Sequence, residues 1–511
     1  MTTSDRERTR HPDRRSAWWG RRGAVPDAGP AASGALPAHA DVLVVGAGLT
    51  GLSTAVLLAR AGRPPVVVEA RVAGAGTTGH STAKLSLLQG SVLQRLQQHT
   101  GPEVVAAYVR ANRAGQLWLL EELRKRDVAV QPHLAVTYAV TPGGARKVAR
   151  EAEVSREAGL PVVDVADPGL PFPVLAAIGL SDQAQFDPLD VVDALRDELR
   201  ELGGTLVEGV RVTGASWSRP WRVATTGGEV VADRVVLATQ YPVLDRGLHF
   251  ARLRASRSYA AAYGVPDAGV LPTAMYLSLD SPTRSVRTAP DPGGELLVVG
   301  GNDHETGRGG STRAKAQDLD AWARQHFGVS APLWSWSAQD YRTSRQVPSV
   351  GPVPGTDGTL LVATGFDKWG MTNAVAAAHV LAGDLLGQPP EYAAGLRSVG
   401  ISPRDVAASV RHNGSVGFRW VADRAVRALP GRTHAVPAEG EGRVEGNPLG
   451  PTAVSTVGGR TCRVSAVCPH LAGILSWNDA EASWDCPLHG SRFTADGRRI
   501  EGPATKDLEP R

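Results

Sequence analysis

The chain has 511 residues, 42% of them hydrophobic and 21% charged, which is the composition of a soluble globular protein with about two to four domains. Its net charge of +4 comes from the first 23 residues, so the remainder is near neutral and predicts neither a nucleic-acid partner nor a membrane surface. No run of about 18 apolar residues occurs, which predicts that no helix spans a membrane.

The N-terminal segment is rich in Arg, Ala, Gly and Pro, and this composition predicts a disordered tail over residues 1–38. Its Arg pairs at 14–15 and 21–22 lack the apolar stretch that an export signal needs. Only three cysteines occur, all in the last fifty residues, which argues against a disulfide framework. We therefore expect a reducing compartment and a cytoplasmic location.

The first predicted domain opens with a β-α-β unit. Asp41–Val45 has the length and apolar character of a buried strand, and Pro65–Glu69 is a second strand that ends in an acid. Between them lie a glycine-rich turn, Gly46–Gly51, and an apolar helix, Leu52–Ala61. This order of elements predicts a Rossmann-like α/β domain.

The turn fits the pattern G-x-G-x-x-G, in which each glycine has a separate purpose. Gly46 permits the tight turn, Gly48 lets the backbone approach a pyrophosphate, and Gly51 lets the helix pack close to the strand. Glu69 lies where a carboxylate accepts from ribose hydroxyls and disfavours a 2′-phosphate. The alternative is a glycine turn in a nucleotide-free fold, and the motif by itself does not separate FAD from NAD.

Later segments continue this mixture of predicted helices and strands up to about residue 426, where the sequence pattern changes. We predict a helical region over 91–127, loop and strand over 159–180, and a helix over 189–202 that Gly203-Gly204 ends. Further strands are expected at 205–212, 229–238, 275–285, 295–299, 334–341 and 360–363, and a small-residue helix at 372–386. Beyond residue 426 long helices give way to short strands and turns, so we place a linker at 396–425.

Several segments between about Ala40 and Gly387 resemble the FAD-dependent oxidoreductases of the D-amino-acid-oxidase superfamily. They are the small-residue loop Gly74–Thr82, Gln185–Pro188 before a helix, the strand end Val235–Thr239, Ala363–Phe366, and Gly370–Thr372. The resemblance implies FAD and a flavoprotein domain over 39–395. It implies that the flavin contacts Gly46, Gly48, Gly51, Glu69, Thr78, His80, Ser81, Val212, Thr239, Gly365, Met371 and Thr372.

The same resemblance implies how this domain is divided. FAD-binding segments are expected at about 40–90, 181–245 and 345–390, and a mainly β substrate domain at about 91–180 and 246–344. Val299-Gly300-Gly301-Asn302 lacks the context of a second dinucleotide motif, so a separate NADH site is not supported.

The C-terminal segment contains the most specific signal, Cys468-Pro469-His470 followed after fifteen residues by Cys486-Pro487-Leu488-His489. Two thiolates for one iron and two imidazoles for the other are the ligands of a Rieske [2Fe–2S] cluster. The flanking residues also resemble Rieske domains, over roughly 426–511, and imply an all-β fold. A mononuclear zinc site is the alternative, although zinc fingers usually pair two Cys in one half and two His in the other. Cys462 is expected to be a strand residue and not a ligand.

Two departures from the Rieske proteins of membrane complexes bear on the potential. Those relatives carry a disulfide between the cluster loops, where this chain has Gly473 and Leu488. They also place a Tyr hydroxyl on a ligand sulfur, where this chain has Phe493. Because hydrogen bonds to the sulfurs raise the potential, we expect a value low in the Rieske range of about −150 to +300 mV.

The leading hypothesis is dehydrogenation of a small amine or amino acid, with electrons passing through FAD and the cluster to an external acceptor. Arg284, Arg287 and Tyr276 are candidates to clamp a carboxylate, and Lys368 to act on the flavin; the alternative is ordinary surface or ion-paired side chains. His80 resembles the covalently bound histidine of dimethylglycine-dehydrogenase-like relatives. Arg345 stands where relatives often have an acid, which weakens the inference about substrate.

Two rival classes remain open. In one the protein is an electron-transfer or redox partner without a small substrate. In the other it is an oxygen-reactive oxidase with a structural Rieske module. No His pair for a non-haem iron site is found, which argues against a ring-hydroxylating oxygenase. The expected fold class is α/β plus β.

Overall fold

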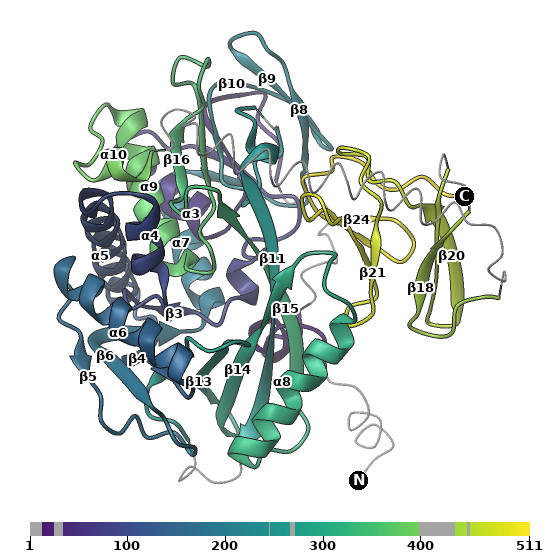
Figure 1. Ribbon diagram of the computed structural model, residues 1–511. Helices are drawn as coiled ribbons and strands as arrows, with labels where there is room; N and C mark the ends of the chain where they lie inside the picture. The colour runs from purple at the N-terminus through teal and green to yellow at the C-terminus, as the bar shows by residue number, and fades with distance from the viewer. Residues whose placement is uncertain (1–12, 25–33, 245, 266–270, 398–434, 447–449) are drawn as a thin grey trace.

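The computed structural model describes residues 13–24, 34–244, 246–265, 271–397, 435–446 and 450–511 (Figure 1). The expected linker at 396–425 lies almost wholly outside these residues. None of the described helices is long and apolar enough to cross a membrane. Of the sheets among these residues, two large ones lie before residue 397 and two small ones lie in the C-terminal part.

The first large sheet is the predicted Rossmann-like sheet, with strand order β16-β17-β10-β1-β2-β7. Its bounds are β1 His39–Val45, β2 Val66–Val68, β7 Thr205–Val207, β10 Gly228–Leu237, β16 Ser349–Pro352 and β17 Leu360–Thr364. Five of these strands run parallel: β1, β2, β7, β10 and β17. Strand β16 is antiparallel to β17. Two further strands, β8 Val212–Ala215 and β9 Trp221–Thr225, extend the sheet beside β10. The inner strands are buried because helices and loops cover both faces.

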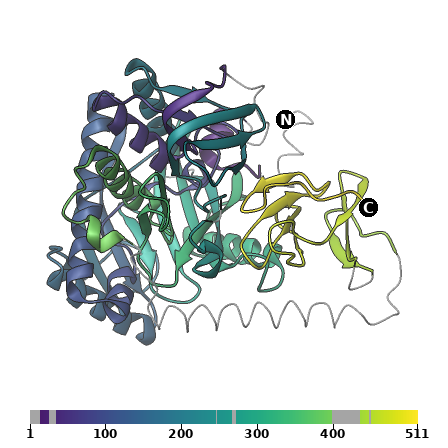
Figure 2. The ribbon, with the colours of Figure 1, turned by 90° about the horizontal axis from the view of Figure 1, so that it is seen from above.

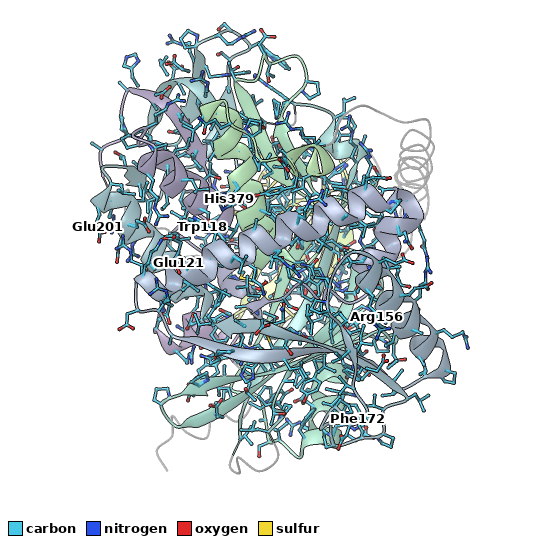
Figure 3. The ribbon with its side chains drawn as sticks, turned by 90° about the vertical axis from the view of Figure 1, so that its left-hand side faces the viewer. Trp118, Glu121, Arg156, Phe172, Glu201 and His379 are labelled. Atoms are coloured by element: carbon cyan, nitrogen blue, oxygen red, sulfur yellow. The ribbon has the colours of Figure 1, made fainter. Side chains whose placement is uncertain are left out.

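Four helices pack together beside this sheet: α3 Leu49–Arg60, α5 Pro102–Lys125, α7 Pro188–Glu201 and α9 Gly370–Leu386. A Cβ on Gly115 of α5 would lie 2.8 Å from the carbonyl oxygen of Thr372, so glycine sets this close crossing with α9. Figure 3 shows Trp118 of α5 next to His379 of α9, with ring centroids 5.5 Å apart. Helix α5 was expected in the substrate domain, but its partners are the helices of the Rossmann-like sheet.

The second large sheet is the predicted mainly β cover, with order β15-β11-β14-β13-β12-β4-β6-β3 and β5 beside β6. Its strands are β3 Lys84–Leu85, β4 Val130–Ala139, β5 Val163–Asp164, β6 Ala176–Phe186, β11 Leu253–Val265, β12 Met275–Ser278, β13 Arg284–Asp291, β14 Gly294–Glu305 and β15 Trp334–Thr343. Helix α8 Thr312–Phe327 packs on β11 and β14, and α6 Pro142–Glu157 on β4 and β6. Sequence patterning did not separate α6 or α8 from their surroundings.

The N-terminal segment corrects one expectation. Residues 13–24 include a short helix, α2 Ala17–Arg21, which lies against β15 and α7. Trp18 and Trp19 are 1% and 7% exposed, and Ser16 caps the helix while its hydroxyl donates to the carbonyl of Gly79. The prediction of disorder over 1–38 is therefore wrong for residues 13–24, because two tryptophans supply apolar surface that the Arg-rich composition concealed.

The C-terminal part is all β, as expected. One sheet consists of β18 Gly442–Glu445, β19 Thr452–Val457 and β20 Arg460–Ser465. The other consists of β21 Ser476–Asn478, β22 Ser483–Asp485, β23 Arg492–Thr494 and β24 Arg499–Glu501, and all neighbours are antiparallel. Figures 1 and 2 both show these strands on the side of the molecule opposite to α5. They therefore meet the two-sheet body at the end where β11 and β15 lie.

Candidate functional site

A cavity of about 480 Å³ runs from the turn after β1 to the face of the second large sheet. The carboxyl ends of β1, β2 and β10 contribute Val45, Val68 and Ala238 to its wall, and the second sheet contributes Leu277, Gly300 and Ala338. Ligands of open α/β sheets bind beyond the carboxyl ends of the strands. The cavity thus has the position expected for a dinucleotide with a substrate chamber beside it.

The glycine turn has the geometry that its sequence predicts. Gly46 has φ +103°, and a Cβ there would lie 2.7 Å from the carbonyl oxygen of Ala238. A Cβ on Gly51 would lie only 1.9 Å from the carbonyl oxygen of Gly46, so the helix approaches the turn as closely as the motif requires. Gly48 lines the cavity and caps α3, which leaves the positive helix terminus open toward an anion.

Two side chains hold this turn from the neighbouring segments. The carboxylate of Glu69 accepts hydrogen bonds from the backbone amides of Ala47, at 2.9 Å, and Arg71, at 3.0 Å, and it lines the cavity. The hydroxyl of Thr78 accepts from the amide of Leu49 at 3.1 Å. These contacts place Glu69 beside the turn, and its role in binding ribose stays a prediction.

Nine of the predicted flavin contacts line the cavity: Gly46, Gly48, Glu69, Thr78, His80, Ser81, Val212, Thr239 and Met371. The other three do not line the cavity, because they make contacts within the protein: Gly51, Gly365 and Thr372. A Cβ on Gly365 would lie 2.4 Å from Cγ2 of Thr343, and the hydroxyl of Thr372 accepts from Gln89 at 2.9 Å. The roles of all twelve in binding flavin stay predictions.

The predicted carboxylate clamp is not supported, because none of its three residues lines the cavity. The Tyr276 hydroxyl donates to the carbonyl of Pro168 at 2.7 Å. Arg284 pairs with Asp318 at 2.7 Å, and Arg287, 1% exposed, donates to backbone carbonyls. These side chains hold neighbouring segments together, so the structure contradicts the predicted carboxylate clamp. Lys368 does line the cavity and pairs with Asp303 at 3.1 Å.

Asp340 and Lys84 are titratable groups that line the cavity and have shifted pKa values. Burial raises the pKa of Asp340 to about 6, although its carboxylate accepts from the amides of Tyr341 and Lys368. Burial and the nearby Arg287 lower the pKa of Lys84 to about 7. Both lie where the second large sheet faces the cavity, and sequence patterning singled out neither.

The four predicted cluster ligands lie on two facing loops. The amide of Cys468 donates to Gly473 at 2.8 Å and that of Cys486 to Ser491 at 2.8 Å, which closes each loop. A Cβ on Gly473 would lie 2.8 Å from Cδ1 of Leu488 and 3.0 Å from the sulfur of Cys486. Gly473 and Leu488 therefore face each other, as the comparison with disulfide-bearing relatives predicted.

The ligand atoms form a sulfur pair and an imidazole pair. Contact with Cys486 lowers the pKa of the Cys468 thiol to about 7, while the same contact and burial raise the pKa of Cys486. The rings of His470 and His489 are 5.0 Å apart at 89°. In the described chain no three His, Cys, Asp or Glu side chains converge on one ion. Two pairs suit a two-iron cluster, in which each iron takes only two protein ligands.

Two family models match the chain: "FAD dependent oxidoreductase" over residues 41–383 and "Rieske [2Fe-2S] domain" over residues 420–510. The chain belongs to the FAD-dependent oxidoreductase family. A Bacillus subtilis (strain 168) protein, YhfW, whose name calls it a Rieske 2Fe-2S iron-sulfur protein, is 28% identical over 477 residues, 92% of either chain. The oxidoreductase is thus an enzyme whose first domain binds FAD and whose C-terminal domain binds a [2Fe–2S] cluster.

Solved structures share the fold of the FAD-dependent oxidoreductase domain. Glycine oxidase from Geobacillus kaustophilus has a TM-score of 0.58 at 20% identity and covers 72% of this chain and 100% of its own. L-proline dehydrogenase from P. horikoshii has a TM-score of 0.59 at 17% identity and covers 74% of this chain and 99% of its own. At these identities the likeness shows the fold alone.

The Rieske domain is docked with its histidines toward the flavin cavity. Tyr241 lines the cavity, and its ring centroid lies 6.0 Å from that of His470 and 6.4 Å from that of His489. Tyr341, also a cavity residue, donates its hydroxyl to the carbonyl of His489 at 3.1 Å. The Nε2 of His489 lies 3.1 Å from the carbonyl oxygen of Phe250.

Close backbone approach makes this interface tight. Gly490 has φ +77°, and a Cβ there would lie 2.6 Å from Cβ of Ala255. Its carbonyl accepts from the side-chain amide of Gln339 at 2.9 Å. A Cβ on Gly307 would lie 2.9 Å from the backbone nitrogen of Pro487. No larger residue fits either position without moving the cluster loop from the oxidoreductase domain.

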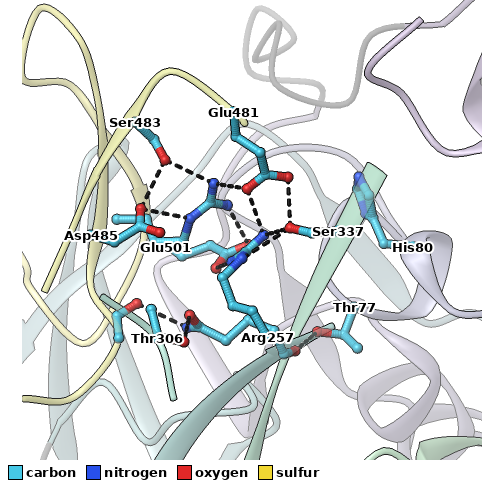
Figure 4. Close-up of polar contacts among 12 residues, drawn as sticks. Thr77, His80, Arg257, Thr306, Ser337, Glu481, Ser483, Asp485 and Glu501 are labelled. Carbon is cyan, nitrogen blue, oxygen red and sulfur yellow. Dashed lines mark hydrogen bonds and ion pairs between the residues drawn. The ribbon is translucent and has the colours of Figure 1, made fainter. Parts of the chain in front are cut away.

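A buried charge network completes the interface (Figure 4). Arg257 of β11 is 1% exposed and pairs with Glu481 at 2.9 Å and Glu501 at 3.5 Å, both in the Rieske domain. Arg492 pairs with Glu481 as well. Burial opposes ionisation of Glu481, but the two arginines outweigh it and lower its pKa to about 2. Arg257 therefore has both of its acidic partners in the Rieske domain, and separating the domains would leave its charge without a partner.

The Rieske domain also caps a helix of the oxidoreductase domain. The carboxylate of Asp479 accepts from the backbone amides of Thr312 and Arg313, at 2.8 and 2.9 Å, and from the Ser311 hydroxyl at 2.7 Å. These amides belong to the first turn of α8, whose orphan donors favour an anion. The residues that make the interface carry no motif, and sequence reasoning missed them.

Proposed function

We propose that the protein dehydrogenates a small amine or amino acid and passes the electrons from FAD to its own Rieske cluster and then to an external acceptor. The observation that carries this proposal is the docking of the cluster histidines on the wall of the flavin cavity. Bound FAD supplies two-electron oxidation of a substrate C–H bond, and the cluster accepts those electrons singly.

The residues between the two cofactor sites suit this order of events. Tyr241 and Tyr341 are each 2% exposed, and their rings are 5.4 Å apart. Both line the cavity and contact His489, Tyr241 through its ring and Tyr341 through a hydrogen bond. Gln339 donates to the Tyr341 hydroxyl at 2.8 Å and accepts from Thr306 at 2.9 Å, which fixes the ring of Tyr341.

The substrate class is supported by fold likeness and by the cavity. The solved relatives quoted above are named for oxidising glycine and proline. The cavity has room beside the glycine turn for a small molecule under β12, β13 and β14, lined by Leu277, Ser285 and Gly301. Its polar groups include Asp340, Lys84 and Lys368, which suit a polar and charged substrate.

The test is anaerobic reduction of the purified holoenzyme by a panel of amines and amino acids, followed by absorbance and low-temperature EPR. A substrate is expected to bleach the flavin and to produce the EPR signal of a reduced Rieske cluster. In Cys486→Ser the same compound is expected to bleach the flavin without that signal. If no compound bleaches the flavin, or if the cluster stays oxidised while the flavin is reduced, the proposal fails.

A further inference from the structure

Lys84 is a cavity cation for which no acidic partner occurs among the described residues. It lies on β3, at the end of the second large sheet, and lines the cavity. Its Nζ donates to the carbonyl of Tyr276 at 2.9 Å and to the Ser285 hydroxyl at 2.5 Å. By contrast Lys368 pairs with Asp303, and Arg342 pairs with Asp367.

The donor geometry leaves one direction open. An ammonium has three N–H donors, and the two neutral acceptors on β12 and β13 take two of them. No third acceptor for Nζ occurs among the described residues, and Lys84 lines the cavity. A ligand in the cavity can therefore supply that acceptor.

The charges around Lys84 determine which charge the ligand should carry. Arg287 of β13 is the charged group that acts on Lys84, and both this arginine and burial lower the Lys84 pKa to about 7. A substrate ammonium beside two cations would be repelled, whereas an anion would be attracted and would favour the ammonium form of Lys84. A carboxylate on a small molecule has the required charge and two acceptor oxygens.

We propose that Lys84 binds a carboxylate of the substrate, so that the substrate is an amino acid and not a simple amine. This inference rests on the proposed function, since it names the substrate class of the same cavity. Ser285 is a positioning residue in this scheme, because its hydroxyl holds Nζ toward the cavity.

The experiment is calorimetric binding of acetate, propionate and benzoate to the oxidised holoenzyme. These carboxylates carry no amine, so no turnover is needed and the outcome is separate from that of the substrate panel. At pH 8 binding is expected to take up close to about one proton, read from titrations in buffers of different ionisation enthalpy. Because the empty Lys84 is largely neutral above pH 7, affinity is expected to fall about tenfold per pH unit there.

In Lys84→Met the affinity for the tightest of the three acids is expected to fall about 10- to 100-fold, with loss of proton uptake. The neutral amide of that acid is expected to bind wild type and variant alike. Lys125→Met is the control, since that lysine pairs with Glu122 at 3.2 Å and does not line the cavity, and proton uptake is expected to remain.

Binding without proton uptake, or absence of binding by all three acids, overturns the proposal even if Lys84→Met does not fold, because both are read on the wild type. Unchanged affinity in a folded Lys84→Met overturns it as well. So does a loss of FAD from that variant with carboxylate binding intact, since Lys84 would then serve the cofactor.

Discussion

The Glu481 carboxylate is the centre of the contact between the two domains, and Glu481→Gln tests whether that contact stabilises the protein. Its oxygens pair with Arg257 at 2.9 Å and with Arg492, and they accept from the Ser337 hydroxyl at 2.6 Å. The glutamine keeps the shape but removes the charge. Both arginines are 7% exposed or less, so water cannot replace the lost partner.

The expected magnitude follows from the pKa of Glu481, which falls from 4.5 to about 2 in the folded protein. At about 1.4 kcal/mol per pKa unit this corresponds to roughly 3 kcal/mol of stability, and breaking a buried pair has a similar cost. Since the folded pKa is the lower one, the contribution is complete above about pH 4.5 and is lost as the pH falls toward 2.

The assay is denaturant unfolding at pH 7, followed through the visible circular dichroism of the cluster so that the Rieske domain is monitored by itself. Glu481→Gln is expected to unfold with about 3 kcal/mol less free energy than wild type. Glu201→Gln is the control, because that glutamate forms a 2.7 Å pair with Arg126 but is 61% exposed, and no change is expected. Equal stability of Glu481→Gln and wild type would refute the reasoning.

Three further predictions concern the cofactors and the N-terminal segment. Cys486→Ser is expected to lose the cluster absorbance and to keep the flavin absorbance, because the two sites share no ligand. Trp18→Ala is expected to lower the free energy of unfolding by about 3–5 kcal/mol and to hasten FAD release, since the buried indole donates to the Ser81 carbonyl at 2.7 Å; release at the wild-type rate would contradict this. The pKa of Asp340 is about 6 in the folded protein and 3.8 in its ordinary, unfolded environment, so the free energy of unfolding decreases as the pH rises between these values. In Asp340→Asn this pH dependence, measured by thermal unfolding, is expected to be absent.

The docked position of the Rieske domain bears on how electrons reach the cluster. The linker predicted between the domains would allow the Rieske domain to move, but the described interface favours one fixed position of that domain. It combines a helix cap from Asp479, a buried charge network around Arg257, and backbone contacts at Gly490. Under the proposed function, electron transfer from flavin to cluster needs no domain movement, and the proposed external acceptor has to approach a different face of the Rieske domain.

The sequence by itself determined the two cofactor modules. Their motifs are local: Gly46 and Gly51 act within one turn, and Glu69 ends the next strand, so spacing along the chain predicts position in space. The two halves of the cluster motif are also short loops whose ligands are identified by type and spacing. The β-α-β unit, the small-residue helix and the all-β C-terminal region were therefore predicted before any tertiary contact was known.

Only the tertiary structure decided which side chains face the cavity and how the modules meet. Arg284 and Arg287 were candidates for a carboxylate clamp, yet in the folded chain Arg284 pairs with Asp318 and Arg287 donates to backbone carbonyls, whereas Lys84 at the end of the sheet lines the cavity. Tyr241 and His489 are 248 residues apart and carry no shared pattern. Contacts between distant segments depend on strand register and domain docking, and neither leaves a periodic signal in the sequence.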